Sequence, residues 1–111
     1  MKKLISLAML LACTGMTATA IAAGNSAAGK VKSAVCAGCH GVDGNSAAPN
    51  FPKLAGQDAQ YLSKQLADFK SGVRKDPIMS GQVANLSKKD MDDLGAYYAA
   101  QKIVPGVANG D

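Results

Sequence analysis

The chain has 111 residues, with 12 Lys and Arg against eight Asp, one His, three Cys and no Trp. This length leaves room for one small domain and excludes two separate hydrophobic cores. The formal charge of +4 favours a nucleic-acid or membrane surface as a partner only if that charge belongs to the folded part of the chain.

Residues 1–23 have the pattern of a secretory signal peptide. Lys2 and Lys3 precede an uncharged apolar run, and a stretch of small residues follows it. The last of these small residues form A-x-A-like triplets, so we expect cleavage just before Gly24 and export to the periplasm. The mature domain would then be residues 24–111.

Two other interpretations of this segment remain open. The sequence LLAC at residues 10–13 could be a lipoprotein cleavage box, which would make Cys13 a lipid anchor. Alternatively, the uncharged residues 4–23 could stay as a membrane helix, although their second half is weakly apolar. Cleavage before Gly24 removes two Lys, so the formal charge falls from +4 to +2 and nucleic-acid binding loses its main support.

The first predicted element of the mature domain is a short Ala-rich helix at residues 26–38. The domain has few large apolar side chains, and a chain of this size usually needs a disulfide, a metal or another staple to hold one structure. Cys36 and Cys39 are the residues most suited to hold such a stabilising group.

Cys36 and Cys39 lie in the sequence Cys-Ala-Gly-Cys-His, which ends at the sole histidine, His40. A disulfide between such close cysteines would close a tiny loop and stabilise little. No β-α-β pattern surrounds the pair, as a thioredoxin-like dithiol would require, and a zinc site would lack ligands. C-x-x-C-H is, however, the attachment signature of c-type haem.

The spacing of this motif suits covalent haem attachment. Two thiols about one helical turn apart can add to the two vinyl groups on one edge of a porphyrin. The next residue can then bring its imidazole to the iron. We therefore expect one haem c, with Cys36 and Cys39 as its thioethers and His40 as an iron ligand.

The middle of the chain predicts a loop and then a helix. Residues 41–56 are punctuated by Gly and Pro, which favours a loop. Residues 58–71 carry apolar side chains at i, i+4 and i+7 from Leu62, which predicts an amphipathic helix that ends at Gly72.

The second axial iron ligand must come from downstream, where only Met79 and Met91 offer a strong donor. Met91 lies in the predicted last helix, residues 88–101, behind the capping pair Ser87 and Asp90, and core packing suits it there. Met79 lies in an irregular stretch with Pro and Gly, from which a flexible thioether can reach a haem face. We therefore expect Met79 as the ligand.

No window of the chain alternates like a strand, so we expect an all-α fold of three to five helices around one haem. The acidic cluster Asp90, Asp92 and Asp93 is most simply a solvated helix start. A polar tail opens at Pro105 and Gly106.

Six blocks are spread along the mature domain: CAGCHG at 36–41, DGNS at 43–46, PNFPKLAGQ at 49–57, YLSKQL at 61–66, DPIM at 76–79 and LGAYY at 94–98. As a set they resemble the class I bacterial cytochromes c, both the short single-haem periplasmic members and one half of the tandem two-haem members. The tandem proteins continue into a second haem domain, whereas this chain ends at Asp111, so one haem is expected.

The resemblance implies the small cytochrome c fold and further roles for single residues. Pro52 matches the family's P-x-L-x-G turn, whose proline carbonyl accepts the N–H of the ligand histidine, with Pro49 as a rival. Gly29 and Gly95 would allow the first and last helices to cross closely.

His/Met ligation leaves no open iron position and favours a one-electron carrier rather than an enzyme. Two alternatives remain. One is a haem protein that binds a small ligand, as a sensor or peroxidase-like enzyme, if Met79 does not ligate iron. The other is a haem-free thiol oxidoreductase.

Expected partners are a redox donor and acceptor, such as a membrane cytochrome complex, an oxidase or a reductase, with no small-molecule substrate. A monomer or weak dimer is expected. Four basic residues would line the haem edge: Lys53, Lys70, Arg74 and Lys75.

Overall fold

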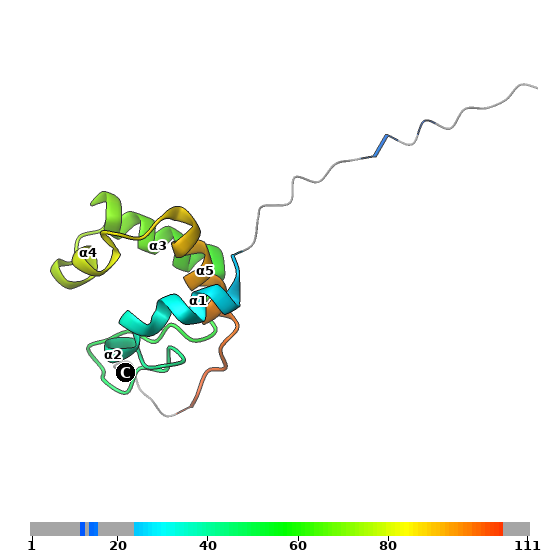
Figure 1. Cartoon of the computed structure of the whole chain (residues 1–111). Helices are drawn as coiled ribbons and strands as arrows, with labels where there is room; N and C mark the ends of the chain where they lie inside the picture. Colours follow the sequence, from blue (N-terminus) through cyan, green and yellow to red (C-terminus); the bar gives the residue numbers. More distant parts are fainter. Residues whose placement is uncertain (1–11, 13, 16–23, 106–111) are drawn as a thin grey trace, which may run out of the picture.

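The computed structural model describes residues 12, 14, 15 and 24–105. Within these residues it is helical and contains no strand, which confirms the expected all-α class. Figure 1 shows the elements: α1 (Ser26–Lys32), the 3₁₀ turn η1 (Ser33–Val35), α2 (Ala37–His40), α3 (Ala59–Ser71), α4 (Pro77–Val83) and α5 (Lys88–Ala99).

The predictions for the two ends of the chain lie largely outside the described residues. Cys13 and the cleavage triplets are among the positions that are not described, as is the tail from Gly106 onward. Of the helices in the described part, none combines the length and the apolar character needed to cross a membrane.

α5 packs against both α1 and α3 and forms the centre of the fold (Figure 1). Leu94, Tyr97 and Tyr98 of α5 form one apolar cluster with Leu62 of α3, and each of these side chains is at most 8% exposed. Burial of a large apolar side chain contributes roughly 1.5–3 kcal/mol. This cluster is therefore a main source of stability. It joins α3 and α5, which support α2 and α4.

Two glycines let α5 approach its neighbours, but they serve different contacts. A Cβ at Gly29 would lie 2.0 Å from the Asp93 carbonyl oxygen, so Gly29 allows the close approach of α1 and α5 that was expected. The expectation for Gly95 is wrong in its partner, because a Cβ there would lie 2.5 Å from the carbonyl oxygen of Ala59. Gly95 therefore serves the contact of α5 with α3.

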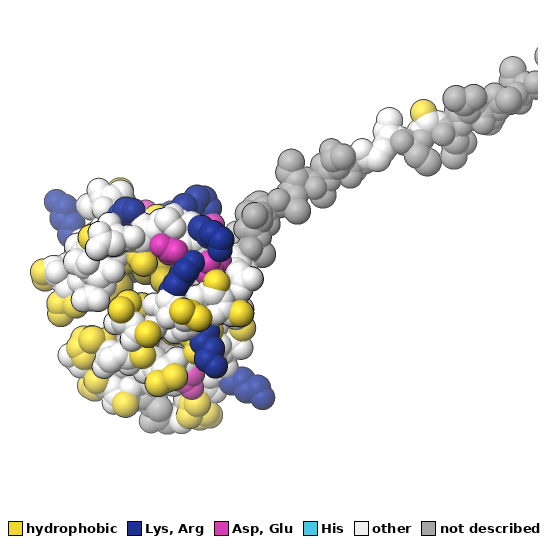
Figure 2. Space-filling view, in the orientation of Figure 1, with side chains coloured by type: hydrophobic (Ala, Val, Ile, Leu, Met, Phe, Trp, Pro, Cys, Tyr) yellow, Lys and Arg dark blue, Asp and Glu magenta, His cyan; other side chains and the backbone are white. Residues whose placement is uncertain are grey.

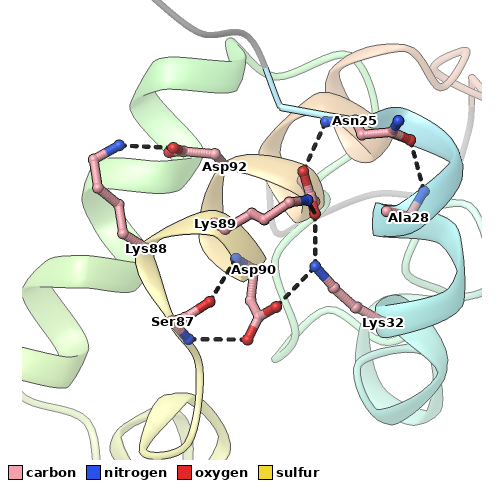
Figure 3. A network of polar contacts seen from close by, with 9 residues as sticks. Asn25, Ala28, Lys32, Ser87, Lys88, Lys89, Asp90 and Asp92 are labelled. Atoms are coloured by element: carbon pink, nitrogen blue, oxygen red, sulfur yellow. Dashed lines mark hydrogen bonds and ion pairs between the residues drawn. The ribbon is translucent and has the colours of Figure 1, made fainter.

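The start of α5 is not the solvated acidic turn that its sequence suggests. Asp93 is only 1% exposed, and it accepts the backbone N–H of Asn25 at 2.7 Å (Figure 3). Its other oxygen lies 2.6 Å from Lys32 Nζ and 2.8 Å from Lys89 Nζ. The pairing with Lys32 and Lys89 holds the pKa of Asp93 well below its usual range. Asp93 thus ties α1 to α5, because its partners come from both sides of the crossing.

Capping side chains start the two longest helices where the sequence predicts. Asp58 accepts the N–H of Tyr61 at 2.8 Å and begins α3, which ends at Gly72 with a left-handed φ of +84°. Ser87 and Asp90 form the predicted capping box of α5. These helix boundaries are confirmed to within two residues.

The stretch around Met79 is helical, which corrects the expectation of an irregular segment. Asp76 caps α4 by accepting the N–H groups of Ile78 and Met79, both at 2.9 Å. Pro77 occupies the first turn, where its missing N–H leaves no carbonyl unpaired. The Asp-Pro pair is a helix-start signal, whereas the prediction took Pro77 and Gly81 together as marks of an irregular stretch.

The predicted helix 26–38 is broken in its middle by η1. Ser33 Oγ donates a hydrogen bond to the Lys30 carbonyl oxygen at 2.7 Å, and such local bonds of Ser compete with the regular helical pattern. The break reorients the chain and allows α2 to form a separate turn.

Candidate functional site

The two cysteines and the histidine of the motif lie on one tight turn. The backbone N–H groups of Cys39 and His40 both donate to the Cys36 carbonyl oxygen, at 3.3 and 3.0 Å. Both thiols are free, and Cys39 is exposed whereas Cys36 is half-buried against the core cluster. Burial raises the pKa of Cys36. The turn therefore offers one accessible thiol and one that faces the helices.

His40 is held in a defined orientation. Its side chain is buried, and Nδ1 lies 2.8 Å from the Pro52 carbonyl oxygen. A carbonyl oxygen only accepts hydrogen bonds, so Nδ1 carries the proton and Nε2 keeps a free lone pair. The Phe51 ring packs edge-on to the imidazole with centroids 6.5 Å apart. The imidazole is therefore fixed in the tautomer that a metal ligand needs.

The loop between α2 and α3 is tied down at several points, which fixes the Pro52 carbonyl. Gly44 has a φ of +79°, a conformation that favours glycine, and its carbonyl oxygen accepts the N–H of Leu54 at 2.8 Å. Tyr97 Oη donates to the Val42 carbonyl oxygen at 2.7 Å and fastens the loop to α5. The core helix thus supports the position of His40 through its loop.

The two methionines lie in different surroundings. Met79 is half-buried on α4, and Figure 1 places α4 and α2 on the same side of α5. Met91 is 6% exposed and belongs to the buried face of α5. The structure therefore gathers the cysteines, His40 and Pro52 into one group, and it carries Met79 on a separate element.

These residues fit a covalently bound haem. One turn presents two free thiols and an imidazole with an available Nε2. The Tyr98 hydroxyl is buried and has no hydrogen-bond partner among the described residues, so it can still form a hydrogen bond with a bound group. Figure 2 shows a hollow between the part of the molecule that carries α4 and the part that carries α2, with hydrophobic side chains around it.

The basic residues expected at the haem edge have different partners within the chain. Lys53 lies in the loop and donates to the Val104 carbonyl oxygen at 3.0 Å. Lys70 donates to the Leu86 carbonyl oxygen, and Arg74 lies 4.5 Å from the centre of the Phe69 ring. Three of them lie close together in the chain: Lys70 in the last turn of α3, and Arg74 and Lys75 before the start of α4.

Two residues of the site have no assigned role in the sequence interpretation. Ser46 is fully buried, and its hydroxyl bonds the carbonyl oxygens of Cys39 at 3.3 Å and Ala48 at 3.0 Å. Tyr98 lies against Cys36 from α5. Ser46 lies in a block shared with the resembled family, which was the available signal. Tyr98 also lies in a shared block, LGAYY at 94–98, but that block does not indicate that its hydroxyl would be buried without a partner.

Comparison with known proteins assigns the family. The cytochrome c family model matches residues 26–101. Cytochrome c4 from Pseudomonas aeruginosa is 53% identical over 108 residues, which cover 97% of this chain and 52% of that protein. The thiosulfate dehydrogenase electron acceptor from Stutzerimonas stutzeri is 52% identical over 66 residues, 59% of this chain and 31% of that protein.

A solved structure agrees with these relatives. The crystal structure of reduced cytochrome c4 from Pseudomonas stutzeri matches with a TM-score of 0.71 at 50% identity, over 74% of this chain and 48% of that one. The chain thus spans about half the length of the cytochrome c4 proteins that it matches. The matched residues include the complete C-x-x-C-H motif and all the helices. The chain is therefore a member of the cytochrome c family, with covalently bound haem c as its cofactor.

Proposed function

We propose that this chain is a periplasmic one-electron carrier with a single haem, attached through Cys36 and Cys39 and ligated by His40 and Met79. The observation that carries the proposal is the 2.8 Å contact between His40 Nδ1 and the Pro52 carbonyl oxygen. This contact orients the imidazole, leaves Nε2 for iron and makes the nitrogen a stronger donor.

When bound, the haem supplies an iron that takes up one electron from a donor and passes it to an acceptor. His40 and Met79 would keep both axial positions filled in both oxidation states, which favours electron transfer over catalysis at an open iron. A thioether ligand stabilises the ferrous state and raises the reduction potential. The helical frame of α1, α3 and α5 supports the ligand-bearing turn and so limits rearrangement between the two states.

The single haem follows from a sequence with one C-x-x-C-H motif and one histidine. Export follows from the signal pattern of residues 1–23. Redox proteins are the proposed partners, and the similarity to a protein named as the electron acceptor of thiosulfate dehydrogenase supports this class. The basic residues Lys70, Arg74 and Lys75 would steer an acidic partner toward the side of the molecule that carries α4.

The absorption spectrum of the purified protein tests the axial ligands. We expect the far-red band of an iron–thioether bond in the oxidised form and no change when carbon monoxide is added to the reduced form. Absence of the band, together with carbon monoxide binding, would favour a ligand-binding haem protein of the sensor or peroxidase-like kind. Free thiols on a chain without haem would instead indicate a thiol oxidoreductase.

A further inference from the structure

The Tyr98 hydroxyl is a buried polar group that the proposed electron-transfer site does not use. Its side chain is 3% exposed, and Oη has no hydrogen-bond partner in the described part of the chain. The neighbouring Tyr97 differs, because its hydroxyl donates to the Val42 carbonyl oxygen at 2.7 Å. Buried hydroxyls nearly always form a hydrogen bond, so an unpaired one indicates that its partner is complete only when the cofactor is attached.

Two polar groups adjoin this hydroxyl, the Cys36 sulfur and the Ser33 side chain. Cys36 packs against the cluster that contains Tyr98, whereas Cys39 is exposed. Burial raises the pKa of Tyr98, the neighbouring Cys36 raises it further, and Ser33 opposes the rise. Burial also raises the pKa of Cys36, while the Tyr98 hydroxyl opposes that rise, as a donor to sulfur does. The two groups are thus close enough to influence each other.

We propose that Tyr98 Oη donates a hydrogen bond to the Cys36 sulfur in the haem-bearing protein and thereby positions one edge of the haem against α5. The inference rests on the proposed attachment through Cys36. A thioether sulfur has no hydrogen and only accepts, so it complements a hydroxyl donor. Ser33 also adjoins the Tyr98 hydroxyl, but the Ser33 hydroxyl already donates to the Lys30 carbonyl oxygen at 2.7 Å. Cys39 is exposed, so the bond would act on one of the two thioethers.

The bond has a consequence for electron transfer. The positive end of the O–H dipole would point toward the haem edge in a water-poor environment. Reduction adds an electron to the haem, so a positive dipole end nearby favours the ferrous state and raises the potential. Tyr98 would therefore be a positioning residue that also tunes the potential.

The test compares the haem-bearing wild type with Tyr98→Phe, which removes only the hydroxyl. Tyr61→Phe is the matched control, because Tyr61 is 48% exposed on α3. We expect a lower midpoint potential in Tyr98→Phe and an unchanged one in Tyr61→Phe. In proton NMR spectra of the reduced wild type we expect a slowly exchanging hydroxyl proton with nuclear Overhauser contacts to the Cys36 β-protons. This signal should be absent in Tyr98→Phe.

An unchanged potential in Tyr98→Phe would overturn the inference, as would a hydroxyl proton whose contacts lead to a haem propionate instead of Cys36. If Tyr98→Phe cannot be obtained with haem attached, the inference is tested by the wild type alone, through the contacts between the hydroxyl proton and the Cys36 β-protons. The intact mass of the denatured wild type, measured first, separates the two proposals. A mass without haem contradicts the proposed function, whereas a haem-bearing protein without the Tyr98 contact contradicts only this inference.

Discussion

At the scale of single residues, the surroundings of a side chain that could bind iron decide its role more than its residue type does. His40 and the two cysteines occupy one turn, and the Pro52 carbonyl fixes the imidazole at 2.8 Å. The two methionines have equal donor chemistry but unequal surroundings, because Met91 is 6% exposed within α5 and Met79 is half-buried on a short helix. A ligand must be free to turn toward iron, and this requirement favours Met79.

Replacement of each methionine by Leu separates ligand from packing. Met79→Leu should abolish the far-red band, lower the midpoint potential and allow the reduced form to bind carbon monoxide, because one axial position opens. Met91→Leu should keep the band and lower the free energy of unfolding by less than about 1.5 kcal/mol, since the swap conserves volume. Loss of the band in Met91→Leu with its retention in Met79→Leu would reverse the ligand assignment.

The residue types of this site are visible in the sequence, but their contacts are visible only in part. C-x-x-C-H predicts a haem site because covalent haem attachment and iron ligation need the two cysteines and the histidine in that order and spacing. The bond to Pro52 was accessible only through family resemblance, since residues 12 positions apart meet through a loop that follows no simple period. The unpaired hydroxyl of Tyr98 depends on everything that surrounds it, and no local pattern encodes such a property.

At the scale of elements, the crossing of α1 and α5 organises the fold. Gly29 permits the close approach, and Asp93 adds ion pairs to Lys32 and Lys89 together with a hydrogen bond from Asn25 (Figure 3). The crossing supports the Tyr97 hydroxyl that fastens the loop behind His40. Damage to the crossing should therefore reach the haem site through this loop.

Gly29→Ala tests the close approach. The new Cβ would lie 2.0 Å from the Asp93 carbonyl oxygen, so the helices must separate, and we expect a loss of roughly 1–3 kcal/mol in the free energy of unfolding. Gly81→Ala in α4 is the control, because a Cβ there meets nothing within 4 Å. Chemical denaturation of both haem-bearing variants measures the difference. Equal stability of Gly29→Ala and wild type would show that α1 does not pack on α5 in this way.

The acid dependence of stability tests the ion pairs of the crossing. Pairing with Lys32 lowers the pKa of Asp90 to about 2 and that of Asp93 still further, against about 3.9 in the unfolded chain. Both carboxylates therefore stabilise the fold fully above about pH 3.9, and this stabilisation is lost as the pH falls through that value toward the folded-state pKa values. Asp93→Asn should lower stability at neutral pH and flatten the acid dependence.

Asp68→Asn is the control for Asp93→Asn, because Asp68 pairs with Lys64 within α3 and does not join two helices. It should leave the acid dependence of the wild type nearly unchanged. Denaturation curves between pH 2 and pH 7 compare the three proteins. An acid dependence that is equally steep in Asp93→Asn and wild type would exclude a role for the buried carboxylate.

Element boundaries followed from the sequence where a cap and an apolar face agreed, as in α3 and α5. They failed at α4, where Gly81 masked the Asp76-Pro77 start signal, and at η1, where one Ser33 hydrogen bond interrupts a helix-forming stretch. Asp93 shows a different limit. Its burial depends on Lys32, 61 residues away, and an acidic run at a helix start looks solvated until that partner is known.

At the scale of the whole molecule, a short chain combines a small apolar core with a cofactor site. The buried apolar cluster comes from α3 and α5, while the ligand-bearing turn and α4 border the hollow in Figure 2. Lys2 and Lys3 lie in residues 1–23, so residues 24–111 carry a formal charge of +2 instead of +4. A nearly neutral domain with three basic residues near α4 suits brief encounters with redox proteins better than tight binding to a polyanion.

The intact mass of the protein from the periplasmic fraction tests the composition of this domain. We expect the mass of residues 24–111 plus one haem, retained after denaturation because both thioethers are covalent. Cys36→Ala should lower the yield of haem-bearing protein, and the same change at Cys39 should do likewise. A mass that includes a lipid on Cys13, or residues 1–23 intact, would contradict cleavage before Gly24 and indicate an anchored carrier.

A spectroelectrochemical titration of the purified protein tests the central claim most directly. We predict one reversible one-electron transition per chain, with the same midpoint in the presence and absence of carbon monoxide, because His40 and Met79 would hold the iron in both states. A midpoint that shifts with carbon monoxide, or a chain that takes up no electron at all, would contradict it.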